Sequence, residues 1–136
     1  MTPPELAAQA LQDFGQARGW EARNRLLLQW ANRLPLLPEA ERSDALLVPG
    51  CQSPVWLQAR QLEGQWQFRA ASQSRLMAGL LALVLVRIEG MNSASVAGFA
   101  LPEWLAKLGL AGQLSASRSN GLNAIWQQLQ RQLALH

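Results

Sequence analysis

Cys51 is the only cysteine in the chain and the residue best suited to nucleophilic chemistry. It lies in the segment 49–54, where two prolines, a glycine and two polar residues are typical of a turn. A lone cysteine is more often a buried structural thiol, and composition alone favours that interpretation. A thiol at the tip of a turn is accessible, however, and with no second cysteine in the chain it can attack a sulfur atom of another protein.

A second candidate segment runs from Ser117 to Ser119. A serine here is expected to cap the last helix, because its side-chain oxygen can accept a hydrogen bond from a free backbone N–H. The simplest interpretation of Arg118 is an exposed arginine that follows this cap. A more specific one is that Arg118, at a helix amino terminus, places its positive charge near a Cys51 thiolate or a carboxylate of a partner protein. A nearby cation favours the reactive thiolate.

Other kinds of site are disfavoured by the residues present. The only histidine, His136, is the last residue, so the Cys–His dyad of a cysteine protease is not expected. One cysteine and one histidine are too few for a zinc site with nitrogen and sulfur ligands, so no metal is expected. The glycines at 109 and 112 lack the lysine and the spacing of a phosphate-binding loop.

The composition predicts a single domain over residues 1–136. Hydrophobic residues make up 49% of the chain and charged residues 15%, which allows a core and argues against disorder. The isoelectric point is about 10.4, yet the net charge is only +3. Because the basic residues are interleaved with acidic ones and form no run that could follow a phosphate backbone, nucleic acid is not an expected partner.

The sequence also predicts a cytoplasmic protein without a membrane segment. The absence of a cysteine framework fits a reducing compartment. The first residues lack the basic and apolar regions of a signal peptide. The longest uncharged apolar run, Leu76 to Val86, is shorter than the roughly 20 residues that a membrane-spanning helix needs.

Two helices are expected before the Cys51 segment. Apolar residues at helical spacing predict one helix that starts at Pro3 and breaks near Gly15. They predict a second helix from about Trp20 to Leu34, which ends because Pro35 lacks the amide donor that continuation requires. Residues 38–42 are expected to form one short turn.

Three short runs around Cys51 predict strands. Residues 45–48 are apolar, residues 55–62 alternate loosely, and residues 65–70 alternate cleanly between apolar and polar types. Glu63-Gly64 is a compact turn signal between the last two runs, which therefore form a hairpin with one buried face.

Helices are expected again in the second half of the chain. Residues 74–89 are apolar nearly all round, which predicts a buried helix that ends at Gly90. Short helices are predicted at 93–98 and 102–108, and a last helix is predicted to begin near 117–119. The expected fold class is α+β, with a small three-stranded antiparallel sheet and helices packed on one face.

Two stretches of the chain resemble the SufE/CsdE family of sulfur-acceptor proteins. One is residues 50–56, with the sequence GCQSPVW, and the other is residues 115–124, with the sequence SASRSNGLNA. The likeness extends from about Leu11 to Leu133 and includes Trp20-Glu21, the RLPLLP stretch at 33–38 and the GLLA stretch at 79–82. Each motif is modest alone, but two in the right order and spacing, in a chain of this length, are specific.

The resemblance implies a SufE/IscU-like fold and a partner cysteine desulfurase, SufS- or CsdA-like. That partner strips sulfur from free cysteine with pyridoxal phosphate, and no tightly bound cofactor is expected on this chain. Cys51 would take the sulfur as a persulfide and pass it to a downstream acceptor or scaffold protein, usually toward iron–sulfur cluster assembly. Gly50, Gln52 and Ser53 would shape the loop, and Arg118 with its flanking serines would bind the partner or stabilise the thiolate.

Three functions remain open at this point. The first is a sulfur acceptor and desulfurase activator, which carries a covalent intermediate but is not an enzyme on its own. The second is a non-covalent module that docks on and modulates an enzyme, with Cys51 inessential. The third is a basic nucleic-acid-binding protein, which requires salt-sensitive binding.

Overall fold

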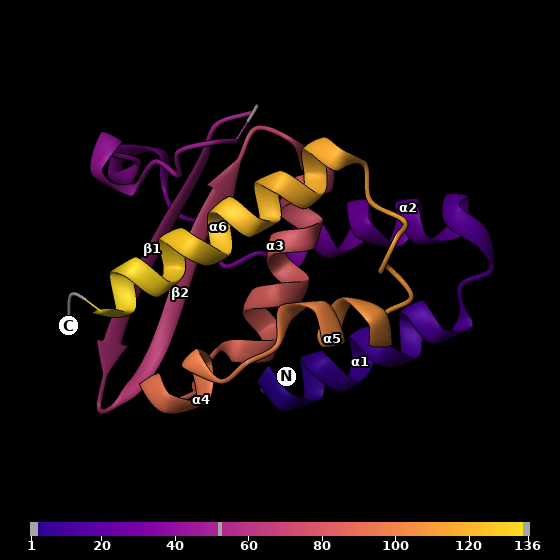
Figure 1. Ribbon diagram of the computed structural model, residues 1–136, viewed down its shortest axis with the longest axis horizontal. Helices are drawn as coiled ribbons and strands as arrows, with labels where there is room; N and C mark the ends of the chain where they lie inside the picture. The colour runs from indigo at the N-terminus through magenta and orange to yellow at the C-terminus, as the bar shows by residue number, and fades with distance from the viewer. Residues whose placement is uncertain (1–2, 52, 135–136) are drawn as a thin grey trace.

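The computed structural model describes residues 3–51 and 53–134 and shows helices packed around a two-stranded hairpin (Figure 1). Three short 3-10 turns precede the hairpin. Among the helices of the described ranges, none has the length and apolar character that crossing a membrane requires. The architecture is the predicted α+β class. The helices are α1 (Pro3–Gln16), α2 (Gly19–Trp30), α3 (Arg75–Ile88), α4 (Ser93–Ala97), α5 (Leu101–Lys107) and α6 (Ala116–Ala134); the turns are η1 (Ala31–Arg33), η2 (Glu39–Glu41) and η3 (Asp44–Leu46); the strands are β1 (Val55–Leu62) and β2 (Gln65–Ser72).

Helix α3 forms the centre of the core. The Ser74 side chain caps it by accepting a hydrogen bond from the Met77 amide at 3.3 Å. From Met77 to Ile88 every residue except Arg87 is buried, as the apolar pattern predicts, and α1, α2, β2 and α6 pack around the helix. A Cβ added at Gly79 would lie 2.7 Å from the carbonyl carbon of Leu27, so glycine is what allows α2 and α3 to cross so closely.

The hairpin forms as its alternating sequence predicts. Strands β1 and β2 pair antiparallel over their whole length, from Val55 opposite Ser72 to Leu62 opposite Gln65. Glu63 and Gly64 connect them with φ angles of 55° and 81°, the left-handed conformation that two-residue hairpin turns require. The alternate residues that face the helices are buried: Val55, Leu57, Ala59, Trp66, Phe68 and Ala70.

Both edges of the hairpin are covered by other parts of the chain. On the β1 edge the Gln132 side chain of α6 acts like a strand: its amide donates to Leu57 O and accepts from the Ala59 N–H, both at 2.8 Å. On the β2 edge the Ala70 N–H donates to Pro35 O at 2.9 Å. These contacts satisfy backbone groups that would otherwise be open to pairing with another molecule.

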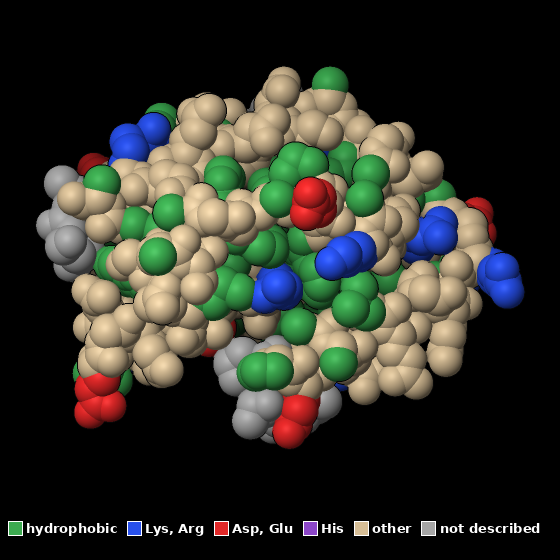
Figure 2. All heavy atoms as spheres, turned by 60° about the horizontal axis from the view of Figure 1, so that its bottom comes forward, with side chains coloured by type: hydrophobic (Ala, Val, Ile, Leu, Met, Phe, Trp, Pro, Cys, Tyr) green, Lys and Arg blue, Asp and Glu red, His purple; other side chains and the backbone are tan. Residues whose placement is uncertain are grey.

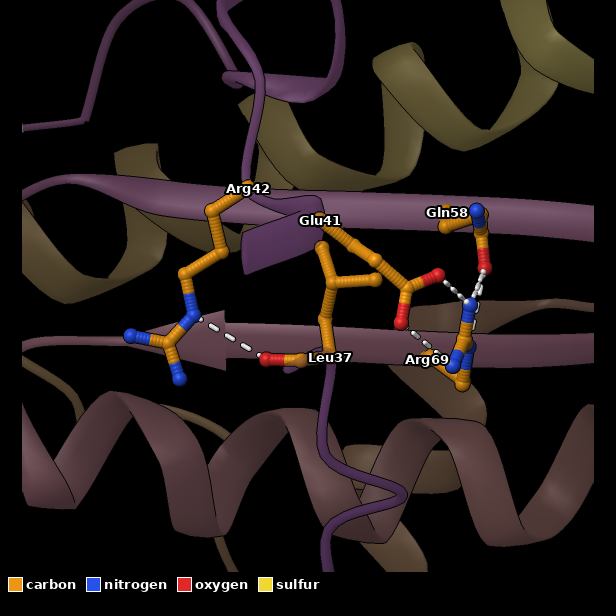
Figure 3. A network of polar contacts seen from close by, with 5 residues as sticks. All are labelled: Leu37, Glu41, Arg42, Gln58 and Arg69. Carbon is orange, nitrogen blue, oxygen red and sulfur yellow. Dashed lines mark hydrogen bonds and ion pairs between the residues drawn. The ribbon is translucent and has the colours of Figure 1, made fainter. Parts of the chain in front are cut away.

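The segment before the Cys51 loop crosses the outer face of the hairpin (Figure 3). Arg69 of β2 donates to both carboxylate oxygens of Glu41, at 2.7 and 3.3 Å, and to the side chain of Gln58 on β1. Arg42 donates from Nε to Leu37 O at 3.0 Å. Because the Arg69–Glu41 ion pair is partly exposed, it positions η2 on the strands but contributes no more than about 1 kcal/mol.

The third strand predicted at residues 45–48 is not confirmed, and the described sheet has two strands. The first half of that run belongs to η3, and only Leu47 makes a single antiparallel bridge, to Trp56. Pairing stops there because Pro49 has no amide donor and Gly50 turns the chain away with φ 89°. Leu47 is also 38% exposed and only Val48 of the run is buried, so the run lacks the continuous buried face of a core strand.

Candidate functional site

The Cys51 loop is closed at its base by backbone contacts. The Val48 N–H donates to Val55 O at 2.8 Å, and the Gln73 N–H donates to Pro54 O at 3.3 Å. At its start Gly50 adopts the left-handed φ of 89°, which glycine reaches without steric cost. The turn predicted at this place is present, and Gln52, predicted to shape it, lies outside the described residues.

The Cys51 thiol is half-buried and directed toward α6. Its Sγ lies 3.8 Å from the backbone oxygen of Gly121, to which it can donate a weak hydrogen bond. It also packs against the hydrophobic core. Burial raises the pKa of the Cys51 thiol above its ordinary value, because the thiolate would lose hydration. The resting side chain is therefore a protonated thiol at neutral pH. It is less exposed to solvent than the predicted position at the tip of a turn suggests.

A pocket of about 270 Å³ opens beside the thiol and brings the two predicted segments together. Cys51 and Ser53 lie on one wall, and Ser117 and Arg118 lie on another. Ser119, predicted as part of the same group, lines a different hollow with Leu101 and Leu105 of α5. The full lining of the Cys51 pocket is Cys51, Ser53, Val55, Ser74, Met77, Ser115, Ser117, Arg118 and Gly121.

Two helix amino termini meet at this pocket. Ser74 caps α3, and Ser115 caps α6 by accepting a hydrogen bond from the Arg118 amide at 3.2 Å. The prediction that a serine of 117–119 caps the last helix is thus wrong, because α6 begins earlier in the chain and those residues lie in its first turn. Helix amino termini carry partial positive charge and favour anions.

Five residues of the pocket wall were not among the predicted site residues: Val55, Ser74, Met77, Ser115 and Gly121. Ser74 had a usable signal, since a serine directly before a long apolar run is a common helix cap. Gly121 had one too, as a glycine inside a helical pattern often marks close packing. A Cβ on Gly121 would lie 3.0 Å from the terminal methyl of Met77, a tight contact that a small shift of the flexible Met77 side chain would relieve.

A larger hollow lies at the other end of the molecule, and no cysteine, serine or threonine is among its lining residues. It measures about 510 Å³ and lies between α1, the end of α3 and α5, with Leu11, Trp104 and Lys107 in its lining. Figure 2 shows hydrophobic side chains gathered on this side of the molecule among a few charged ones. Within the described ranges no three His, Cys, Asp or Glu residues come together as metal ligands. The smaller pocket is therefore the candidate site, because Cys51 is part of its lining.

Comparison with known proteins gives matches over most of the chain. Residues 8–133 match the family model SufE, described as an Fe-S metabolism associated domain. The chain is 35% identical to the sulfur acceptor protein CsdE of Escherichia coli, over 92% of each protein. It is 32% identical to an uncharacterized SufE-like protein of Haemophilus influenzae, over 88% of this chain and 95% of that one.

The fold also matches a solved structure. A hypothetical protein from Thermus thermophilus, determined in solution, superposes with a TM-score of 0.74 at 25% identity. The match covers 98% of this chain and 96% of that one. The agreement therefore extends over nearly the whole chain, including the hairpin and the helices that form the Cys51 pocket.

Proposed function

Because this chain belongs to the SufE family, we propose that it accepts sulfur from a cysteine desulfurase on Cys51 and activates that enzyme. The observation that carries the proposal is the meeting of Cys51 and Arg118 in one pocket, at the end of a loop that a left-handed glycine turns outward from the hairpin. The relative named a sulfur acceptor, at 35% identity, supports the same role for this chain.

The proposed transfer is a thiol–persulfide exchange. The Cys51 thiolate attacks the outer sulfur of a persulfide on the desulfurase cysteine, and a new S–S bond forms at Cys51. The old S–S bond breaks and its electron pair leaves on the desulfurase cysteine as a thiolate. One sulfur atom moves from the desulfurase cysteine to Cys51 without a net change of oxidation state, so the exchange needs no external oxidant or reductant. Pyridoxal phosphate belongs to the desulfurase, which generates the persulfide.

The residues around Cys51 have separate parts in this proposal. Contact with the partner would draw the thiol away from Gly121 O, and Arg118 with the ends of α3 and α6 would stabilise the thiolate and then the persulfide anion. Gly50 and Ser53 allow the loop to extend. The persulfide would then pass to a downstream acceptor or scaffold protein, toward iron–sulfur cluster assembly or related sulfur trafficking.

A non-covalent docking module is the second candidate, and one observation favours it. Burial raises the pKa of Cys51, which disfavours the thiolate in the resting protein. In that case the protein would stimulate its partner without carrying sulfur, and Cys51 would be a packing residue.

Desulfurase turnover separates the two candidates. We expect the chain to raise the rate of sulfur release from cysteine by a SufS- or CsdA-like desulfurase, and we expect Cys51→Ser to abolish this stimulation. The serine is close in size to cysteine, so circular dichroism of the variant should match the unchanged protein. Full stimulation by a folded Cys51→Ser protein would favour the docking module instead.

A further inference from the structure

We propose that the larger hollow, between α1, the end of α3 and α5, belongs to a groove that docks an acidic amphipathic helix of a partner protein. The inference goes beyond the proposed function, because it concerns a second surface at the other end of the molecule from Cys51. The hollow of about 510 Å³ adjoins another of about 430 Å³. The two share Arg87, Met91, Trp104 and Lys107 in their linings, and together they are called the distal groove.

The distal groove is elongated and has helices along its sides. Ala7, Ala8 and Leu11 line it at the spacing of one face of α1. At its other end α4 contributes Ser95 and α5 contributes Glu103. The two alanines keep the α1 side low, so another helix can approach. An amphipathic helix that lays its apolar face into a groove is a common mode of protein recognition, and two adjoining hollows can take two of its side chains.

Apolar side chains of the distal groove are open to solvent. Leu11 is 38% exposed, and Met91 and Phe99 are partly exposed. Trp104 lies at the base of the groove, where its indole N–H donates to Leu83 O at 2.9 Å and fixes the ring. Figure 2 shows hydrophobic side chains gathered on this face with charged ones among them. An exposed apolar surface with polar residues around it is typical of an interaction site.

Two cations of the distal groove have no carboxylate partner in the fold. The guanidinium carbon of Arg87 lies 5.6 Å from the ring centre of Phe99 and 5.8 Å from that of Trp104. Lys107 is exposed and is the only lysine of the chain. Among the residues that the structure describes, neither Arg87 nor Lys107 has an ion pair. Carboxylates of a partner can therefore pair with both.

The acidic residues of the distal groove leave these cations available. Glu89 is directed toward β2, where its Oε2 accepts a hydrogen bond from the Phe68 N–H at 3.2 Å. Glu103 lines only the smaller hollow. It lies four residues before Lys107 on α5, but no ion pair joins these two side chains in the described part of the chain. Because the two cations line both hollows, the groove favours a negatively charged partner.

A second copy of this chain fits the distal groove less well than an acidic partner does. A symmetric dimer uses the same surface of both copies. Such a dimer through the groove would bring Arg87 and Lys107 of one copy toward the same cations of the other. Like charges that face one another across an interface disfavour association.

A partner in the distal groove would leave Cys51 accessible. Met77 lines the Cys51 pocket and Arg87 lines the groove, and both belong to α3. They are ten residues apart, which is about 15 Å along the helix axis. The chain can therefore hold one protein at the groove while Cys51 exchanges sulfur with another.

The test uses a rhodamine-labelled helical peptide of about 16 residues, with leucines at i, i+3, i+4 and i+7 and glutamates beside them. Fluorescence anisotropy should show saturable binding, with a Kd that rises several-fold between about 20 and about 300 mM salt. Replacing the glutamates of the peptide by lysines, or its leucines by serines, should abolish binding, because the groove offers both positive charge and apolar surface. If the ends of the peptide are blocked, a carbodiimide should couple its carboxylates to Lys107.

Lys107→Glu should raise the Kd of the peptide about tenfold at low salt, whereas Lys107→Arg should keep it within about twofold. Arg131→Glu is the matched control, because it changes the net charge equally on α6, where Arg131 bonds to Gln128. Its Kd should also stay within about twofold of the original. Ala8→Phe should weaken binding without a change of charge, since the added ring would occupy the larger hollow.

Two controls separate the distal groove from folding and from the acceptor role. Thermal unfolding followed by circular dichroism should show that Lys107→Glu and Ala8→Phe remain folded. Lys107→Glu should still gain sulfur on Cys51, as judged by mass spectrometry. Loss of sulfur uptake by the original protein would count against the proposed function and leave the groove standing.

Three results would overturn the distal groove. One is the absence of saturable binding by the glutamate peptide, or equal binding of its lysine counterpart. Another is an equal effect of Arg131→Glu and Lys107→Glu, which would reduce the effect to net charge. The third is dimerisation in analytical ultracentrifugation that Lys107→Glu abolishes, which would assign the groove to a second copy of this chain.

Discussion

Replacing Gly79 by alanine should destabilise the protein, although alanine normally favours helices. Gly79 lies inside α3 at its crossing with α2. A Cβ there would lie 2.7 Å from the Leu27 carbonyl carbon and 3.1 Å from its Cα. Both are backbone atoms, so no side chain can rotate away and the two helices must separate.

The size of the effect follows from two opposed terms. Alanine gains about 1 kcal/mol over glycine inside a helix. Overpacking against backbone costs about 3 kcal/mol or more. We therefore expect a net loss of about 2 kcal/mol. For 136 residues the unfolding entropy is roughly 0.29 kcal/mol/K, so the melting temperature should fall by about 7 °C.

Gly15 provides the matched control for this measurement. It also lies in a helix, α1, but is exposed, and a Cβ there would meet no atom within 4 Å. Gly15→Ala should raise the melting temperature by about 3 °C, because the helix term of about 1 kcal/mol acts alone. Thermal unfolding followed by circular dichroism at one scan rate suffices for both variants. A Gly79→Ala protein as stable as the Gly15→Ala protein would refute the close crossing of α2 and α3.

Three further predictions concern the Cys51 thiol, Glu89 at the far end of α3 and the cap of α6. Because burial raises the pKa of Cys51, its alkylation rate by iodoacetamide should rise with pH around a midpoint above that of the same thiol in the urea-unfolded chain; an equal or lower midpoint would contradict its shelter. Burial likewise raises the pKa of Glu89, and this effect is larger than the lowering of the pKa by the Phe68 N–H and by Arg60. The folded protein therefore loses stability as the pH rises through the Glu89 pKa, because the buried carboxylate must then ionise. Glu89→Gln should then be the more stable protein in urea at about pH 8, with a smaller advantage at about pH 5; an advantage that grows on acidification would show the sign to be wrong. Ser115→Ala should lower stability by about 1 kcal/mol through loss of the α6 cap, whereas exposed Ser117→Ala should change it by less than about 0.5 kcal/mol, and equal effects in urea unfolding would argue against Ser115 as the cap.

The sequence predicts the hairpin and the buried helix well because local pattern determines both. Residues 65–70 alternate strictly and Glu63-Gly64 suits a two-residue turn, so neighbouring residues contain the information. The strand prediction for the run 45–48 is wrong because its apolar character serves one buried residue, Val48, and one bridge at Leu47. A strand there would also need an amide donor at position 49, which proline does not have.

The sequence predicts the two segments of the candidate site, but it does not predict that they lie in one pocket. A single cysteine between glycine and proline marks the loop, and a serine–arginine–serine segment marks a helix start. That Cys51 and Arg118 share one pocket depends on how α6 packs across β1 and α3, and residues distant in sequence determine that packing.

Mass spectrometry of the intact protein, after incubation with a cysteine desulfurase and free cysteine, tests the central claim most directly. We expect a gain of one sulfur atom that a reductant removes, that peptide mapping places on Cys51, and that Cys51→Ser lacks. A folded protein that stimulates SufS- and CsdA-like desulfurases but gains no sulfur would contradict the acceptor role and leave a docking module in its place.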